Sequence, residues 1–122
     1  MIGRLSTVVL DCPDPRALAA FYSEVLGMPI TRAEGDWVDI GDRDGTQVSF
    51  QLAPDHVPPR WPDPAYPQQF HLDVDVDDIA AAEERVLALG AAKVREDGTF
   101  RVYTDPAGHP FCLVLAPSQP AG

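Results

Sequence analysis

Hydrophobic and polar positions alternate along several short segments of the chain, and this pattern predicts strands. The alternation is strictest in residues 46–52 (TQVSFQL), where apolar side chains at 48, 50 and 52 interleave with polar ones at 47, 49 and 51. Because successive side chains of a strand point to opposite faces, we expect this segment to be a half-buried strand. Other short β-rich segments are predicted as strands as well: residues 6–12, 28–33, 36–41, 69–76, 92–95, 99–104 and 111–116.

Two longer segments follow the helical period instead. Residues 16–27 (RALAAFYSEVLG) and 79–90 (IAAAEERVLALG) space their apolar residues three and four apart, and each ends on a glycine. Asp14 suits the N-cap position of the first helix, and Asp77 or Asp78 that of the second. The chain therefore places one helix after the first strand of each half.

The two halves of the chain repeat each other. Three features of the first half recur 63 residues later: Gly45 as Gly108, residues 52–54 (LAP) as residues 115–117, and Gly27 as Gly90. The first strand, residues 7–14, matches residues 71–78 at a spacing of 64. Self-similarity at a constant period indicates a duplicated structural unit.

Each half has the element order βαβββ, which predicts an α+β fold of two modules in tandem. We assign residues 1–55 to the first module and 68–117 to the second, with a Pro-rich connector at 56–67 and a tail at 118–122. Neither half has a sufficient core of its own, so we expect the two to share one. The expected result is a curved, mostly antiparallel eight-stranded sheet around a central cavity, with helices outside, and such concavities bind small molecules.

Composition narrows the range of partners. The net charge of −10 disfavours nucleic acid; it either serves solubility alone or attracts cationic small molecules. No apolar run is long enough to span a membrane, and the N-terminus lacks the apolar core of a secretory signal, so we expect a cytoplasmic protein. Cys12 and Cys112 belong to no CxxC pair and are expected as free thiols. In the connector, Trp61 and Tyr66 are expected to pack on the body or on a partner.

The paired modules resemble the vicinal oxygen chelate superfamily, which includes glyoxalases, bleomycin-resistance proteins and dioxygenases. The chain is most similar to small actinobacterial-type glyoxalase-like members. Four segments carry the resemblance: residues 12–28 (CPDPRALAAFYSEVLGM), 71–79 (HLDVDVDDI), 88–91 (ALGA) and 103–114 (YTDPAGHPFCLV). The resemblance implies a small-molecule cavity and a homodimer.

Metal-using members of this superfamily hold a divalent ion with four side chains from first and fourth strands. The resemblance places those positions at Thr7, Ser49, His71 and Cys112. His71 suits a metal, and Cys112 could bind a soft one as thiolate, whereas neutral hydroxyls compete badly with water. We therefore expect no cofactor at the usual four-ligand site, with His71 and Cys112 as the weak candidates for a divalent metal.

Seven residues are candidate ligand contacts, and each has a structural alternative. They are Thr7, Trp37, Ser49, Gln51, His71, Asp73 and Cys112. His71 is either a hydrogen-bonding or acid–base group of the cavity or a structural histidine. Asp73 shares its strand face and either orients His71, meets a cationic ligand or is simply solvated. Trp37 either stacks on a ligand or fills the core.

Two functions remain open at this point. The first is a metal-independent protein that binds a small organic molecule, similar to the drug-sequestering resistance members. The second is an enzyme, a lyase, isomerase or dioxygenase, that uses His71 as a metal ligand or general base. The fold alone favours neither.

Overall fold

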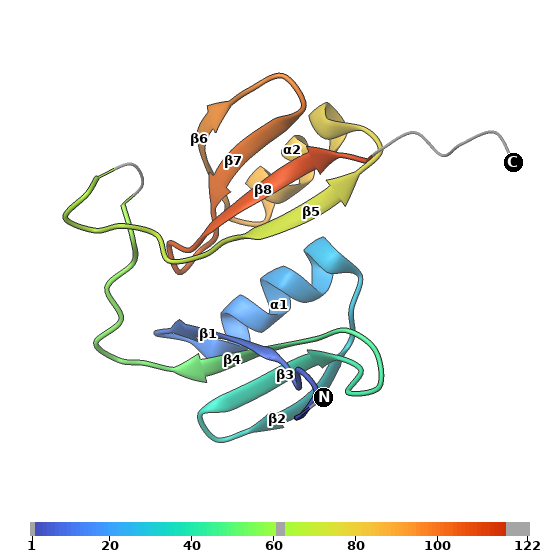
Figure 1. Ribbon diagram of the computed structural model, residues 1–122, viewed down its shortest axis with the longest axis vertical. Coiled ribbons are helices and arrows are strands. Elements are labelled where there is room, and N and C mark those ends of the chain that lie inside the picture. The colour runs from blue at the N-terminus through green and yellow to red at the C-terminus, as the bar shows by residue number, and fades with distance from the viewer. Residues whose placement is uncertain (1, 61–62, 117–122) are drawn as a thin grey trace, which may run out of the picture. The chain divides into compact units, whose positions relative to one another are not determined.

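The computed structural model describes residues 2–60 and 63–116, so Trp61 and the predicted tail lie outside the described residues (Figure 1). The chain divides into two compact units, residues 1–57 and 58–122. Each unit is described by itself below.

The first unit is a four-stranded sheet with one helix. Its elements are β1 (Val8–Cys12), α1 (Pro15–Leu26), β2 (Ile30–Glu34), β3 (Trp37–Gly41) and β4 (Gln47–Leu52). The strand order is β1-β4-β3-β2; β1 runs parallel to β4, and the other two pairings are antiparallel. Helix α1 lies across one face of this sheet (Figure 1).

The second unit repeats this architecture. Its elements are β5 (Leu72–Val76), α2 (Ile79–Ala88), β6 (Ala92–Glu96), β7 (Phe100–Thr104) and β8 (Pro110–Leu115). The order β5-β8-β7-β6 again has one parallel pairing, β5 with β8, and two antiparallel ones.

These observations confirm the α+β class, the two βαβββ modules and the mostly antiparallel pairing. The expectation of one eight-stranded sheet needs correction, because the strands form two sheets of four. Thr7 and His71, expected inside first strands, each precede their strand by one residue.

The helices begin where the sequence predicts. Asp14 accepts a hydrogen bond from the Ala17 amide at 3.1 Å, and Asp78 accepts one from the Ala81 amide at 3.0 Å. These bonds satisfy amides that have no partner within the helix. Asp78, rather than Asp77, is therefore the second cap. Helix α1 ends at Gly27, whose φ of 65° lies in the left-handed region that glycine adopts without strain.

The duplication extends to the backbone irregularities of the sheets. The pairing of β2 with β3 shifts register between Ile30 and Arg32, and that of β6 with β7 shifts between Lys93 and Arg95. Bulges of this kind bend a strand and redirect its side chains. In both sheets the first paired residue after the shift is an arginine, Arg32 on β2 and Arg95 on β6, and both strands are edge strands.

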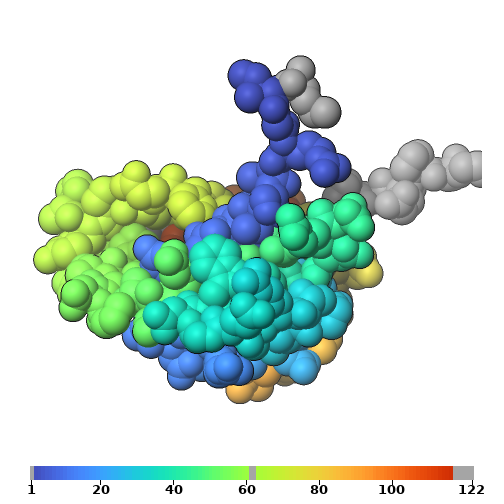
Figure 2. All heavy atoms as spheres, turned by 90° about the horizontal axis from the view of Figure 1, so that it is seen from below, coloured from blue at the N-terminus to red at the C-terminus, as the bar shows by residue number. Residues whose placement is uncertain are grey.

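The core of the first unit forms where α1 covers the sheet. Tyr22 of α1 stacks on Phe50 of β4 with ring centroids 5.8 Å apart, and both residues are fully buried. All five residues of β2 are exposed, which agrees with the surface position of this strand in Figure 2. The apolar side of the first sheet therefore faces the helix, and its other side is available for polar chemistry.

Candidate functional site

A buried polar cluster lies on the first sheet, on the face opposite its apolar side chains. Its centre is Asp39 of β3, which is paired in register with Ser49 of β4. Ser49 donates to Asp39 Oδ1 at 2.5 Å, and the indole Nε1 of Trp37 donates to the same oxygen at 2.6 Å. The Thr7 and Ser49 hydroxyl oxygens are 2.8 Å apart and share a hydrogen bond. We call these four residues the Asp39 cluster.

Burial explains why the cluster needs all of its members. Ser49 is fully buried and Asp39 is 6% exposed, so the carboxylate depends on protein donors in place of water. Two donors on one oxygen are charge-assisted hydrogen bonds, which hold the Asp39 side chain in one orientation. Trp37 and Ser49 therefore position a carboxylate, in addition to lining the sheet.

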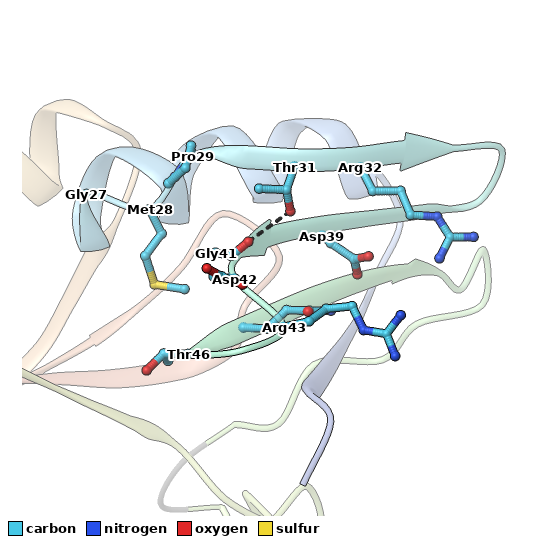
Figure 3. Close-up of a pocket in the computed structure, with 11 residues that line it drawn as sticks. Gly27, Met28, Pro29, Thr31, Arg32, Asp39, Gly41, Asp42, Arg43 and Thr46 are labelled. Carbon is cyan, nitrogen blue, oxygen red and sulfur yellow. Dashed lines mark hydrogen bonds between the residues drawn. The ribbon is translucent and has the colours of Figure 1, made fainter. Parts of the chain in front are cut away.

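Beside the cluster the first unit has an open pocket of about 720 Å³. Asp39 and Gln47 form part of its wall, and Gln47 Nε2 also lies 3.5 Å from Ser49 Oγ, which joins pocket and cluster. One end of the pocket is formed by Met28 and Pro29, and Arg32 and Arg43 extend at the other (Figure 3). This volume is within the range of about 300–1,000 Å³ typical of small-molecule sites.

One part of the pocket wall requires a glycine. Gly41 has φ 85°, and a Cβ at this position would collide with the Thr46 carbonyl oxygen and with Cε of Met28. The Gly41 amide donates to the Pro29 carbonyl at 2.9 Å, and its own carbonyl accepts from Thr31 Oγ1 at 2.9 Å (Figure 3). Only glycine allows the strand end and the following loop to approach so closely.

The two arginines of the pocket differ in their surroundings. Arg32 donates to Glu34 at 2.9 Å, and this hydrogen bond raises the pKa of its guanidinium. Asp39, the register partner of Arg32 on the neighbouring strand β3, adds a smaller increase to this pKa. Arg43 has no ion pair within the described residues. The pocket thus combines a held carboxylate with a cation that can still take a partner.

A second group of reactive side chains is found in the second unit. Asp73 of β5 and Cys112 of β8 are register partners, and His71 precedes Asp73 by two residues. His71 Nε2 lies 3.1 Å from Asp73 Oδ1, and one potential ligand atom from each of the three residues lies within 4.8 Å of the others. We call them the His71 cluster.

The thiol of this cluster is protonated at neutral pH. Burial, followed by the nearby Asp73 carboxylate, raises the pKa of Cys112 to about 11. Cys112 is 4% exposed, whereas His71 and Asp73 are exposed. In the absence of a cation, the cluster is therefore a hydrogen-bonded acid–base group with an inert thiol beneath it.

The sequence candidates thus separate into two groups. Thr7, Trp37 and Ser49 meet in the Asp39 cluster, and His71, Asp73 and Cys112 meet in the His71 cluster. Gln51 belongs to neither: it is exposed, and its carbonyl accepts from the Cys12 thiol at 3.7 Å.

Sequence reasoning missed Asp39, the residue that joins cluster and pocket. Period-two spacing from Trp37 could have found it, since both side chains fall on one face of the same strand. The loop residue Arg43 has no such signal in the sequence.

The paired modules and the polar sheet faces define a class of protein built by duplication of a βαβββ unit. Residues 7–114 match the model of the glyoxalase-like domain family. The chain belongs to this family, and with it to the vicinal oxygen chelate superfamily.

Solved structures show the same fold at low sequence identity. A glyoxalase/bleomycin resistance protein/dioxygenase family enzyme from Burkholderia phytofirmans is 18% identical, with a TM-score of 0.73 over 91% of this chain and 97% of the other. A glyoxalase-related enzyme from Fulvimarina pelagi is 19% identical, with a TM-score of 0.71 over 99% and 94%. The trypanothione-dependent glyoxalase I of Leishmania major is 18% identical, with a TM-score of 0.64 over 93% and 86%. No curated protein matches the sequence.

The superfamily's usual metal set is not reproduced by the side chains present. Of its four positions, Thr7 and Ser49 are hydroxyls that bond to each other and to Asp39. Neutral hydroxyls are poor ligands for a divalent ion, and these two are already engaged. His71 and Cys112 can serve as ligands, and Asp73 adds a third donor from outside the usual set.

No helix among the described residues is long and apolar enough to cross a membrane.

Proposed function

We propose that the protein binds a small organic molecule in the pocket of its first module, without the superfamily's usual four-ligand metal site. The observation that supports this proposal best is the pocket of about 720 Å³ whose wall includes the held carboxylate of Asp39. A concave site with an apolar end and a few fixed polar groups is the usual form of a small-molecule site.

The surroundings of Asp39 favour a ligand with a cationic or hydrogen-bond-donating group. The Trp37 and Ser49 bonds both end on Oδ1, which among the described residues leaves Oδ2 as the oxygen for a ligand donor. Met28 and Pro29 supply apolar surface for the body of the ligand. The sequence predicted direct ligand contacts for Thr7, Trp37 and Ser49. In this proposal these three residues instead hold Asp39 in position and do not contact the ligand.

A thermal-shift screen of small cationic and aromatic compounds tests this function, followed by calorimetric titration of each hit. We expect hits to raise the melting temperature of the wild type and to bind Asp39→Asn at least tenfold more weakly, since a ligand cation loses its counter-charge. Asp44→Asn is the matched control, because Asp44 lies in the adjacent loop but does not line the pocket. Equal affinity for all three proteins would contradict the proposal.

One observation favours a second candidate function, catalysis at His71. The Nε2 atom of His71 lies 3.1 Å from Asp73 Oδ1, an arrangement in which a carboxylate orients an imidazole. The enzyme would be a glyoxalase-like lyase, isomerase or dioxygenase, with His71 as general base or metal ligand. Turnover that is lost in His71→Ala and kept in Asp39→Asn would support it; turnover that persists in His71→Ala would exclude it.

We further propose that the protein works as a cytoplasmic homodimer, as its family resemblance implies. The glyoxalase-like fold and the lack of a membrane-spanning helix among the described residues are compatible with this.

A further inference from the structure

The His71 cluster brings together three different metal-binding atoms, two from neighbouring strands and one from the residue just before β5. Asp73 and Cys112 stand opposite each other on β5 and β8, which run parallel. His71 is two residues before Asp73, so its side chain falls on the same face of the sheet. Strand pairing therefore fixes the carboxylate beside the thiol, and the imidazole lies next to them at the start of the same strand.

The spacing suits a single ion. The potential ligand atoms lie within 4.8 Å of one another, whereas two ligands of a tetrahedral zinc are about 3.5 Å apart at bond lengths of roughly 2.0–2.3 Å. The remaining adjustment is about an ångström, and it falls on His71 and Asp73, whose side chains are 34% and 61% exposed. The buried Cys112 can stay in place.

The donor types select the ion. Nitrogen, oxygen and sulfur together favour a borderline cation such as Zn²⁺ over Mg²⁺ or Ca²⁺, which prefer oxygen ligands alone. We propose that His71, Asp73 and Cys112 form a three-ligand site for a borderline divalent cation, built by the second module alone. Asp73, which lies outside the superfamily's four positions, takes the place of the ligands that Thr7 and Ser49 do not supply.

Cobalt titration of chelator-treated, tag-free protein tests the site without an assay of activity. A thiolate bound to Co²⁺ gives a near-ultraviolet charge-transfer absorption, so the readout reports Cys112 directly. We expect this absorption to saturate at one Co²⁺ per chain and to disappear when Zn²⁺ is added. In Cys112→Ser the absorption should be absent, while His71→Ala and Asp73→Asn should weaken Co²⁺ binding at least tenfold.

Two controls match these variants. Cys12→Ser removes the other cysteine, which lies in the first unit, and Asp75→Asn neutralises the next aspartate along β5, which is outside the cluster. Both should bind Co²⁺ as the wild type does. The proposal fails if no charge-transfer absorption appears, if it persists in Cys112→Ser, or if Asp73→Asn and Asp75→Asn behave alike. Circular dichroism of each variant separates loss of the site from loss of the fold.

This inference is independent of the proposed ligand of the first module. Asp39→Asn should leave cobalt binding unchanged, and Cys112→Ser should leave ligand binding in the pocket unchanged. The two experiments can therefore fail separately.

Discussion

At the scale of single residues, Ser49 shows how one hydroxyl can determine a site. It bonds to Asp39 and Thr7 and is fully buried, so it connects the two halves of the Asp39 cluster. A buried donor that stabilises a carboxylate contributes more than a surface hydroxyl, because no water can replace it. Ser49 therefore affects both the stability of the module and the shape of the pocket wall.

We predict that Ser49→Ala lowers the free energy of unfolding by about 1–3 kcal/mol, the cost of leaving a buried polar group short of a partner. Urea unfolding monitored by circular dichroism measures this difference. Ser23→Ala, on helix α1 and outside the cluster, is the control and should have a much smaller effect. A Ser49→Ala protein as stable as the wild type would show that the cluster does not stabilise the fold.

Cys112 gives a prediction about alkaline pH in the metal-free protein. Its pKa in the folded chain is raised from 9.0 to about 11 by burial and then by Asp73. Between pH 9 and 11 the Cys112 thiol is therefore deprotonated in the unfolded chain before it is deprotonated in the folded chain. The free energy of unfolding falls across that interval.

Unfolding free energies measured from pH 8 to 10.5 should thus fall less steeply for Cys112→Ser than for the wild type. In Asp73→Asn the fall should span a narrower pH interval and be smaller in total, because the Asp73 carboxylate no longer raises the pKa of the thiol. Identical slopes for wild type and Cys112→Ser would contradict the assignment.

At the scale of elements, one carboxylate of helix α2 bonds to three side chains of its sheet. Glu83 accepts hydrogen bonds from Arg101 and from the Tyr103 hydroxyl, each at 2.9 Å, and pairs with Lys93 at 3.0 Å. Few apolar side chains of α2 are buried, and Val86 is the one that its pattern places in the core. Helix α1, by contrast, buries several apolar side chains against its sheet. The polar contacts of Glu83 therefore matter more for holding α2 on its sheet than polar contacts do for α1.

We predict that Glu83→Gln destabilises the protein by about 1–2 kcal/mol at neutral pH, since charge-assisted bonds are lost at a partly exposed position. The hydrogen bond from Lys93 is the largest cause that lowers the pKa of Glu83 below its ordinary 4.5. The ionised Glu83 carboxylate therefore stabilises the fold above pH 4.5, and this stabilisation is lost as pH falls through the lowered pKa. The free energies of unfolding of the wild type and Glu83→Gln should therefore converge in acid.

The control is Glu84→Gln on the same helix, where the side chain is exposed. Thermal unfolding at pH 7 and pH 3 distinguishes the two variants. A Glu83→Gln effect that is the same at both pH values would indicate a packing defect instead of a lost charge.

At the scale of the whole molecule, period and repetition made the architecture predictable. The alternation at residues 46–52 and the helical spacing after Asp14 identify elements, and the recurrence of Gly27 as Gly90 identifies the duplication. The site was only half predictable, since it depends on register. Nothing local in the sequence places Asp39 opposite Ser49, and the position of Arg43 depends on the conformation of a loop.

The family resemblance also predicts the assembly. We expect light scattering after size-exclusion chromatography to give about twice the chain mass of 13.2 kDa. The mass should stay constant on dilution well below the loading concentration. A mass of one chain throughout would mean that this member acts as a monomer.

Because bulges and registers match, each sheet can be compared with the other position by position. Thr7, Val9 and Ser49 occupy in the first sheet the places that His71, Asp73 and Cys112 occupy in the second. One half has retained neutral hydroxyls beside an open pocket, and the other carries three potential ligand atoms on the same frame. An engineer could therefore graft either chemistry onto the opposite half by exchanging a few side chains, with no loop to redesign.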